Sequence, residues 1–259
     1  MTNKRTALVT GGTSGIGLAI TRLLAEAGHD VFICARNAEQ VRLVVKDFAA
    51  EDRSVDGASC DVTVRHQVGE LVAAATQRFG PIDILVNNAG RSGGGVTADI
   101  TDELWHSVID TNLNSVFLVT REVLTAGGLR ERPWGRIVNI ASTGGKQGVM
   151  FGAPYSAAKH GVIGFTKALG LELAKTGVTV NAVCPGYVET PLAQRVRQGY
   201  AQHWGVGTED VRRKFEDRIP IGRYSAPAEI AGMVGYLVSD AADPVTAQAI
   251  NVCGGLGNY

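Results

Sequence analysis

Short apolar runs and longer segments with helical periodicity alternate along most of this chain. The apolar runs are typical of buried parallel strands and predict strands at 5–10, 30–34, 55–60, 82–87, 135–141, 178–184 and 249–253. The periodic segments predict helices at 15–27, 38–51, 64–79, 101–111, 113–128, 153–175 and 226–239. We therefore expect one α/β domain over 1–259. It would contain a doubly wound, seven-stranded parallel sheet with right-handed crossovers and helices on both faces.

One segment, 187–223, interrupts the alternation after the sixth predicted strand. It contains Tyr200, His203 and Trp204, followed by a charged stretch over 209–218. Long insertions in compact domains usually have a function, and this one follows the strand end at which open parallel sheets bind ligands. We interpret the segment as a substrate lid. The alternative is a surface excursion whose aromatic side chains pack only for stability.

A glycine-rich turn, Gly11-Gly12-Thr13-Ser14-Gly15-Ile16-Gly17, joins the first predicted strand to the first predicted helix. In this context, backbone amides at a helix N-terminus can hold the pyrophosphate of a dinucleotide. The turn therefore predicts a cofactor site, although a plain strand-to-helix turn is the alternative. The candidate cofactor residues here are Gly11, Thr13, Ser14, Gly15, Ile16 and Gly17.

The residue after the second predicted strand, Arg36, indicates which dinucleotide is bound. Folds that bind NAD often place an acid about 20 residues after the glycine turn, for the ribose 2′-hydroxyl. Here the first acid is Glu39, and a guanidinium suits a 2′-phosphate instead. Arg36 therefore predicts NADPH, with a solvated arginine at a strand end as the alternative.

Tyr155 and Lys159 are four residues apart in one predicted helix, so their side chains share a face. An ammonium group near a phenol favours the phenolate, and we expect Lys159 to lower the pKa of Tyr155. Ser142 follows the fifth predicted strand. These three residues predict a proton-transfer site that reduces a carbonyl or oxidises an alcohol. Tyr-x-x-x-Lys alone would more often be an ordinary amphipathic helix.

Composition limits the classes of partner. The chain has 259 residues, with 25 basic and 25 acidic side chains, so no global basic field predicts binding to nucleic acid. No apolar run approaches the ~20 residues that span a bilayer, and Met1–Arg5 leaves no room for a signal peptide. We therefore expect a cytoplasmic protein that does not bind membranes.

The cysteines and histidines lack the spacing of metal ligands, so we expect no metal site. We expect buried, reduced thiols at Cys34, Cys60, Cys184 and Cys253. We expect surface positions for His29, His66 and His106.

Several motifs stand in order along the chain: Thr10-Gly11-x-x-x-Gly15-Ile16-Gly17, Asn87-Asn88-Ala89-Gly90, Asn112, Ser142, Tyr155-x-x-x-Lys159 and Pro185-Gly186. Through them the chain resembles the short-chain dehydrogenase/reductase family from end to end, which implies a Rossmann fold. The runs 141–148 and 251–259 further resemble the ketoreductases of aromatic (type II) polyketide synthesis. That resemblance implies NADPH, a homotetramer, and a polyketide β-ketone carried on an acyl carrier protein as substrate.

The resemblance also implies roles for single residues. Tyr155 would donate a proton to the carbonyl oxygen, Ser142 would hydrogen-bond that oxygen, and Lys159 would hold the nicotinamide ribose. Asn112 would position a water between Lys159 and solvent and also serve as a helix-kink residue. The other implied cofactor contacts are Asp61 and Val62 at the adenine, Asn88, Ala89 and Gly90 at the adenosine ribose, and Pro185, Gly186, Val188 and Thr190 at the nicotinamide. Thr190 could equally be a helix cap.

Candidate substrate residues come from two loops and the lid. Ser92, Gly93 and Gly94 stand where the ketoreductase pattern has Pro-Gly-Gly, which loosens the loop and leaves the stereochemistry of the alcohol open. The other candidates offer amide or aromatic surface: Gln147, Tyr200 and Trp204. Two arginines at the end of the lid could attract an acidic carrier protein: Arg218 and Arg223.

Assembly is indicated by an apolar stripe at helical spacing: Val162, Phe165, Leu169 and Leu173. The stripe would pack against a second copy of the chain or face the sheet. The glycine-rich chain end, 254–259, also looks suited to packing against a neighbour.

Two other functions fit the same fold. A general 3-oxoacyl-[acyl-carrier-protein] reductase or a small-ketone reductase would use identical chemistry. A cofactor-sensing Rossmann regulator would catalyse nothing, and it would not need the proton donor at Tyr155.

Overall fold

A parallel sheet forms the centre of the computed structural model, which describes residues 4–257 and 259. Residues 1–3 and Asn258 lie outside the described residues. They belong to the segments Met1–Arg5 and 254–259 discussed above. The sheet has seven strands in the order β3-β2-β1-β4-β5-β6-β7. The strands are β1 (Thr6–Thr10), β2 (Asp30–Ala35), β3 (Val55–Ser59), β4 (Ile84–Asn87), β5 (Gly135–Ile140), β6 (Val178–Pro185) and β7 (Ala249–Val252). The predicted doubly wound sheet is confirmed, with strand ends within two residues of the expected ones.

The helices follow the predicted alternation until the lid. They are α1 (Gly15–Glu26), α2 (Ala38–Ala50), α3 (Arg65–Phe79), α4 (Asp102–Ile109), α5 (Ser115–Leu124), α6 (Ala153–Leu173), α7 (Pro191–Trp204), α8 (Thr208–Glu216) and α9 (Pro227–Leu237). The predicted lid segment is therefore largely helical, with α7 and α8 inside it. Within the described part of the chain, no helix is both long enough and apolar enough to cross a bilayer.

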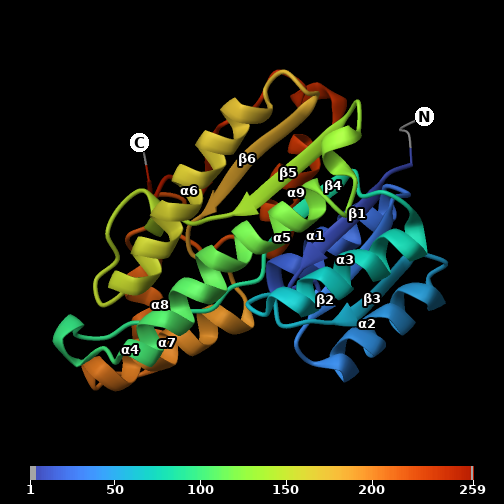
Figure 1. Ribbon diagram of the computed structural model, residues 1–259. Helices are drawn as coiled ribbons and strands as arrows, with labels where there is room; N and C mark the ends of the chain where they lie inside the picture. Colours follow the sequence, from blue (N-terminus) through green and yellow to red (C-terminus); the bar gives the residue numbers. More distant parts are fainter. Residues whose placement is uncertain (1–3, 258) are drawn as a thin grey trace.

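Two apolar cores sandwich the sheet because successive side chains of a strand point to opposite faces. Leu8 packs with α3, α5 and α6, whereas its neighbour Val9 packs with α1, α2 and α9. Figure 1 shows α5 and α6 in front of the sheet and α9 behind it. The connection from β6 to β7 runs through α9, which covers the same face of the sheet as α1. From β6 to β7 the chain moves across the sheet in the opposite direction to its move from β1 to β2. That crossover is left-handed, unlike the right-handed ones of the alternating part.

The strand order reverses on either side of β1, whose neighbours are β2 and β4. In open α/β sheets such a switch point leaves a crevice beyond the carboxyl ends of the strands. The residues that follow β1, β4, β5 and β6 are therefore brought together at one edge.

The sequence predicts a boundary between two helices at residue 112, but the structure has no interruption there. The chain passes from α4 to α5 through one π-helical turn, Asp110–Asn114, without leaving the helical region. Helical periodicity continues across such a turn, so the apolar pattern does not reveal it. The second helix also ends earlier than expected, at Leu124.

One expectation about burial needs correction, and one of the two alternatives for the apolar stripe on α6 is confirmed. His29 is buried, with 9% exposed, because its Nδ1 accepts the Arg5 backbone N–H at 3.3 Å. The predicted stripe on α6 belongs to the sheet side: Val162, Leu169 and Leu173 pack into the apolar cores, and Phe165 packs against them. The stripe is apolar because it packs against the buried side chains of the sheet. The expectation of buried thiols is confirmed for all four cysteines.

Candidate active site

A single continuous cleft of about 1610 Å³ opens at the carboxyl ends of the strands. Ligand pockets for one small molecule are usually about 300–1,000 Å³, so this cleft has room for two ligands end to end. Every residue that the sequence assigned to the catalytic, cofactor or substrate site lines it, except Gly17. The chain therefore brings the predicted residues together, while their individual roles stay predictions.

The glycine turn forms one end of the cleft and is held very close to β4. Gly11 and Gly15 have φ of +66° and +53°, which a side chain would disfavour. Asn88 Nδ2 donates to the carbonyl oxygens of Thr10 at 2.9 Å and Gly11 at 3.2 Å, which ties the turn to the end of β4. Gly17 lies behind this contact, which is why it does not reach the cleft.

The N-terminus of α1 points into the same end of the cleft. Its N-cap residue, Ser14, makes no side-chain capping bond within the described part of the chain. The first amides of the helix and the hydroxyls of Thr13 and Ser14 are therefore available as donors. This donor set fits a pyrophosphate.

Arg36 lies beyond this turn, exposed at the edge of the cleft. Across residues 4–257 and 259, no carboxylate oxygen lies within 4.0 Å of its guanidinium. The nearest acid in sequence, Glu39, is held instead by Arg42 at 2.5 Å. Arg36 is thus free for a phosphate. Asp61 accepts the backbone N–H and the hydroxyl of Thr63 at 3.0 and 2.7 Å, which fixes its carboxylate at the cleft.

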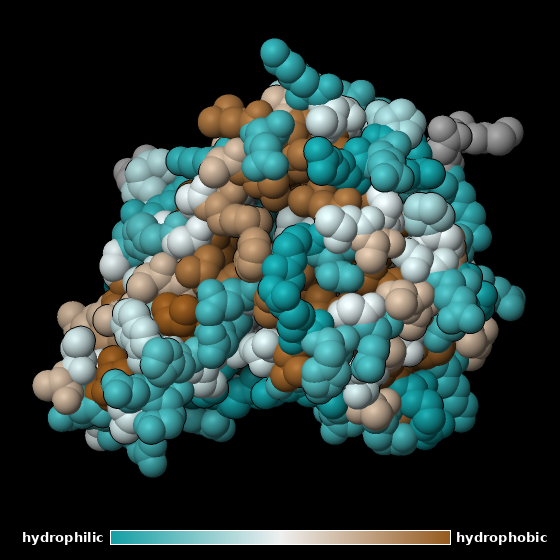
Figure 2. All heavy atoms as spheres, viewed as in Figure 1, coloured by the Kyte–Doolittle hydropathy of each residue, from teal (hydrophilic) through white to brown (hydrophobic). Residues whose placement is uncertain are grey.

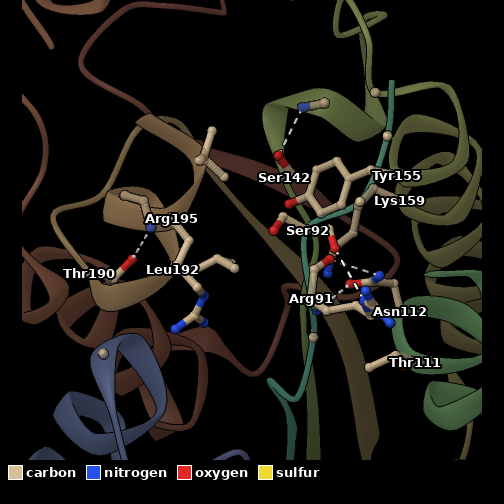
Figure 3. Close-up of a pocket in the computed structure, with 18 of the residues that line it drawn as sticks. Arg91, Ser92, Thr111, Asn112, Ser142, Tyr155, Lys159, Thr190, Leu192 and Arg195 are labelled. Atoms are coloured by element: carbon tan, nitrogen blue, oxygen red, sulfur yellow. Dashed lines mark hydrogen bonds between the residues drawn. The ribbon is translucent and has the colours of Figure 1, made fainter. Parts of the chain in front are cut away.

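Ser142, Tyr155 and Lys159 meet on the opposite wall (Figure 3). Ser142 ends the extended chain after β5, and its Oγ accepts the Gly144 backbone N–H at 3.0 Å. Tyr155 and Lys159 project from the first turns of α6. Lys159 Nζ donates to the Ile140 carbonyl at 2.7 Å, which anchors the buried ammonium beside the end of β5.

The expected lowering of the pKa of Tyr155 by Lys159 is wrong for this structure. Burial raises the pKa of the Tyr155 phenol, and its hydrogen bond with Ser142 opposes that rise. The Lys159 ammonium is 5.8 Å from the centre of the Tyr155 ring and is turned to Ile140. Burial also lowers the pKa of Lys159 to about 8. Tyr155 is therefore a protonated group at neutral pH, suited to donating a proton.

We expect Lys159→Met to change the stability of the cofactor-free protein in a pH-dependent way. The folded pKa of about 8 lies below the ordinary value of 10.5, so the folded state binds fewer protons between these values. Wild-type stability from this group therefore rises by up to about 3 kcal/mol across that window. At pH 8 the buried ammonium makes the wild type less stable than the mutant. In urea unfolding, the difference in free energy of unfolding between mutant and wild type should therefore decrease from pH 8 to 10.5.

Lys167→Met is the matched control, because Lys167 is an exposed lysine of the same helix. It should show no comparable trend. A Lys159→Met difference that stays constant with pH would contradict burial of a titrating ammonium.

Asn112 lies in the π-helical turn and is buried. Its Nδ2 donates to the carbonyls of Val108 at 2.9 Å and Arg91 at 3.0 Å, and its Oδ1 accepts the Arg91 N–H at 3.2 Å. The side chain thus fastens the loop after β4 to the helical turn. A Cβ at Gly90 would lie 2.9 Å from Asn112 Oδ1 and 4.0 Å from Lys159 Nζ, so the glycine leaves space next to both side chains. A water path from Lys159 stays a prediction.

The loop after Arg91 packs more tightly than its glycines suggest. A Cβ at Gly93 would lie 2.3 Å from Val108, and a Cβ at Gly94 would lie 1.8 Å from the Phe151 carbonyl oxygen. The small residues are therefore required by close contact as well as by backbone freedom. Ser92 faces the same cleft as Ser142 and Tyr155 in Figure 3.

The lid aromatics line the cleft and also hold the lid together. The rings of Tyr200 and Trp204 lie 5.2 and 5.9 Å from that of Phe215 on α8. They belong to a separate apolar cluster built around Phe215 and Tyr224. Packing accounts for their burial, and their contact with substrate stays a prediction.

Several cleft residues were missed by the sequence analysis. Arg91, Leu192 and Arg195 line the cleft close to residues that were singled out, and Figure 3 shows them facing it. The available signal was that Arg91 directly follows Gly90 and that Leu192 and Arg195 follow Thr190 within five residues. Thr190 itself caps α7, since its Oγ1 accepts the Ala193 N–H at 3.2 Å.

Attraction of a carrier protein to Arg223 stays a prediction. Its guanidinium is paired with Glu229 at 2.7 Å and donates to the Tyr224 carbonyl. The neighbouring carboxylate offsets part of the charge that Arg223 presents. Arg218 lines the cleft and stays a candidate.

Comparison with known proteins agrees with this site. The family model described as short chain dehydrogenase matches residues 5–201. A proposed ketoacyl reductase of the monensin polyketide synthase from Streptomyces virginiae is 64% identical over 255 residues, which cover 98% of each chain. A proposed ketoacyl reductase of the granaticin polyketide synthase from Streptomyces violaceoruber is 62% identical over 256 residues, covering 99% of this chain and 94% of that protein.

A solved structure is similar along the whole chain. It is a crystal structure of a single-residue variant of the actinorhodin polyketide ketoreductase with NADPH. The two share 59% identity and a TM-score of 0.97, over 100% of this chain and 99% of the other.

Proposed function

The chain belongs to the short-chain dehydrogenase family, and we propose that it is an NADPH-dependent ketoreductase acting on a polyketide β-ketone bound to an acyl carrier protein. The observation that carries the proposal is the arrangement of the cleft. One end offers phosphate-binding donors and Arg36, and the other holds Ser142, Tyr155 and Lys159. The names of the similar proteins support a polyketide substrate.

The residues present fit the cofactor. The amides of the glycine turn would hold the pyrophosphate, Arg36 the 2′-phosphate, and Lys159 the nicotinamide ribose. NADPH, when bound, supplies the hydride for carbonyl reduction. Tyr155 stays protonated at neutral pH because burial raises its pKa, so its hydroxyl can give the proton to the carbonyl oxygen. Ser142 can orient the same oxygen with its hydroxyl, and Asn112 fixes the loop that carries Ser92.

Reduction of a bicyclic ketone tests this function. The purified protein should oxidise NADPH with trans-1-decalone and prefer that ketone to an acetoacetyl thioester. A preference for the short thioester would favour a general 3-oxoacyl reductase. No turnover with any ketone would favour a cofactor-sensing regulator. A cytoplasmic location stays part of the proposal.

Arg36→Ala should raise the KM for NADPH by about tenfold or more and change the KM for NADH little. A charge-assisted hydrogen bond contributes roughly 1.5–3 kcal/mol, and only NADPH carries the 2′-phosphate. Steady-state rates with both cofactors measure the effect. Arg53→Ala, which removes an equal charge outside the cleft, is the control. An equal loss with both cofactors would show that Arg36 has another role.

We also propose a homotetramer in which α5 and α6 pair with their copies. Figure 2 shows apolar side chains gathered over these two helices. They include Phe117 and Leu171, which are 46% and 72% exposed. At Gly164 an added Cβ would meet only open space, which leaves room for a close neighbour. Light scattering at micromolar concentration should give four times the mass of the chain, and a monomer would refute this assembly.

A further inference from the structure

The two walls of the substrate end of the cleft touch across its mouth. One wall is the loop over 148–152, which precedes α6, and the other is α7 of the lid (Figure 1). The Tyr200 hydroxyl donates to the Met150 carbonyl at 2.8 Å. The rings of Phe151 and His203 meet edge to face, with centroids 4.7 Å apart and planes at 66°. Two pairs of residues far apart in sequence therefore close the same opening.

Phe151 is held in an unusual backbone conformation. Its φ is +59°, in the left-handed region that bulky side chains disfavour. Its carbonyl accepts the Gly95 N–H at 2.8 Å, and Gly94 lies too close to that carbonyl for any side chain. A strained residue persists only where its surroundings fix it, and such residues gather at functional sites. Here the ring of this residue lies against the His203 ring of the lid.

The contact between Phe151 and His203 contributes little to the cores. Neither ring belongs to the apolar clusters formed by the described residues, and both line the cleft. Phe151 is half-buried and His203 is exposed. The pair therefore joins the wall next to Ser142 and Tyr155 to the lid, and little else depends on it.

We propose that Phe151 and His203 determine the size of ketone that the cleft admits. Their contact closes the mouth over a compact ketone and must open for an acyl chain that extends past Tyr200. The inference rests on the proposed ketoreductase function for its substrates. Because closure itself does not depend on turnover, it can also be measured without a substrate.

Two variants break the contact from opposite sides. Phe151→Gly removes the ring and suits the positive φ, and His203→Ala changes an exposed residue of the lid. Gln202→Ala is the matched control, because Gln202 is an exposed residue of α7 that does not line the cleft. The substrates are trans-1-decalone and a long-chain β-keto thioester of N-acetylcysteamine, with saturating NADPH.

An aromatic pair of this kind limits the expected change to about two- to tenfold. Each variant should raise kcat/KM for the long thioester by that factor and leave the value for decalone within about twofold. The double variant should gain no more than the better single one, because both remove the same contact. A lower or unchanged rate with the long thioester, or equal changes with both substrates, would overturn the proposal.

Hydrogen exchange of the cofactor-free protein tests the contact without a substrate. His203→Ala should speed amide exchange over 148–152, on the other wall, while Gln202→Ala should leave exchange over 148–152 unchanged. Unaltered exchange over 148–152 in His203→Ala would also overturn the proposal. Absence of ketone turnover by the wild type would instead count against the proposed function, and the exchange result would still decide the role of the pair.

Discussion

Replacing Tyr155 with phenylalanine is expected to lower turnover by at least ~10²-fold while NADPH still binds. The substitution removes the phenolic hydroxyl and keeps the ring. That hydroxyl is the group whose pKa is raised by burial, and it faces the cleft beside Ser142. Without it, the carbonyl oxygen loses its proton donor, because the proposed role of the Ser142 hydroxyl is only to orient that oxygen. The rate of NADPH oxidation with trans-1-decalone measures the loss, and fluorescence titration measures cofactor binding.

Tyr236→Phe is the matched control, since it deletes the same hydroxyl from an exposed tyrosine of α9 outside the cleft. It should leave turnover within about twofold, as surface changes of this kind usually do. Near-normal turnover of Tyr155→Phe would remove Tyr155 from the reaction. A parallel loss of NADPH affinity would show that the hydroxyl mainly supports the cofactor.

Most of the sheet was predictable because buried parallel strands appear in sequence as short, continuous apolar runs. β5 and β6, for example, are buried at every position. The π-helical turn was not predictable, since its residues keep the helical apolar period. The environment of His29 was also hidden, because its partner at Arg5 lies in a separate strand region.

The site was predictable to the extent that its residues lie within ordered motifs. Spacing placed Tyr155 and Lys159 on one face of a helix, and the structure has them on one wall of the cleft. Spacing could not reveal that the Lys159 ammonium donates to the Ile140 carbonyl. It also could not reveal that burial is the largest influence on the pKa of Tyr155. Contacts between distant segments, such as Tyr200 with Met150 or Phe151 with His203, depend on tertiary packing and leave no periodic signal.

Gly17→Ala is expected to weaken NADPH binding by about tenfold to a hundredfold and to lower the melting temperature. A Cβ at Gly17 would lie 2.1 Å from the Gly11 carbonyl oxygen and 2.4 Å from Asn88 Nδ2. These two atoms form the hydrogen bond that ties the glycine turn to the end of β4. Neither can move without changing the shape of the turn that would hold the pyrophosphate. Overpacking of this kind costs about 1–3 kcal/mol, which converts to the stated range of affinity.

The same substitution at Gly69 separates the clash from the general effect of adding a methyl group to a helix. Gly69 lies within α3, where the only described atom near an added Cβ is the flexible Glu122 carboxylate at 3.9 Å. Gly69→Ala should keep NADPH affinity and gain up to about 1 kcal/mol in stability, because alanine favours the helix. If Gly17→Ala behaved like Gly69→Ala in calorimetry and NADPH titration, the proposed clash would be wrong. The turn would then accommodate a methyl group despite the distance of 2.1 Å between the added Cβ and the Gly11 carbonyl oxygen. The close approach of α1 to the turn would then not be what shapes the phosphate end of the cleft.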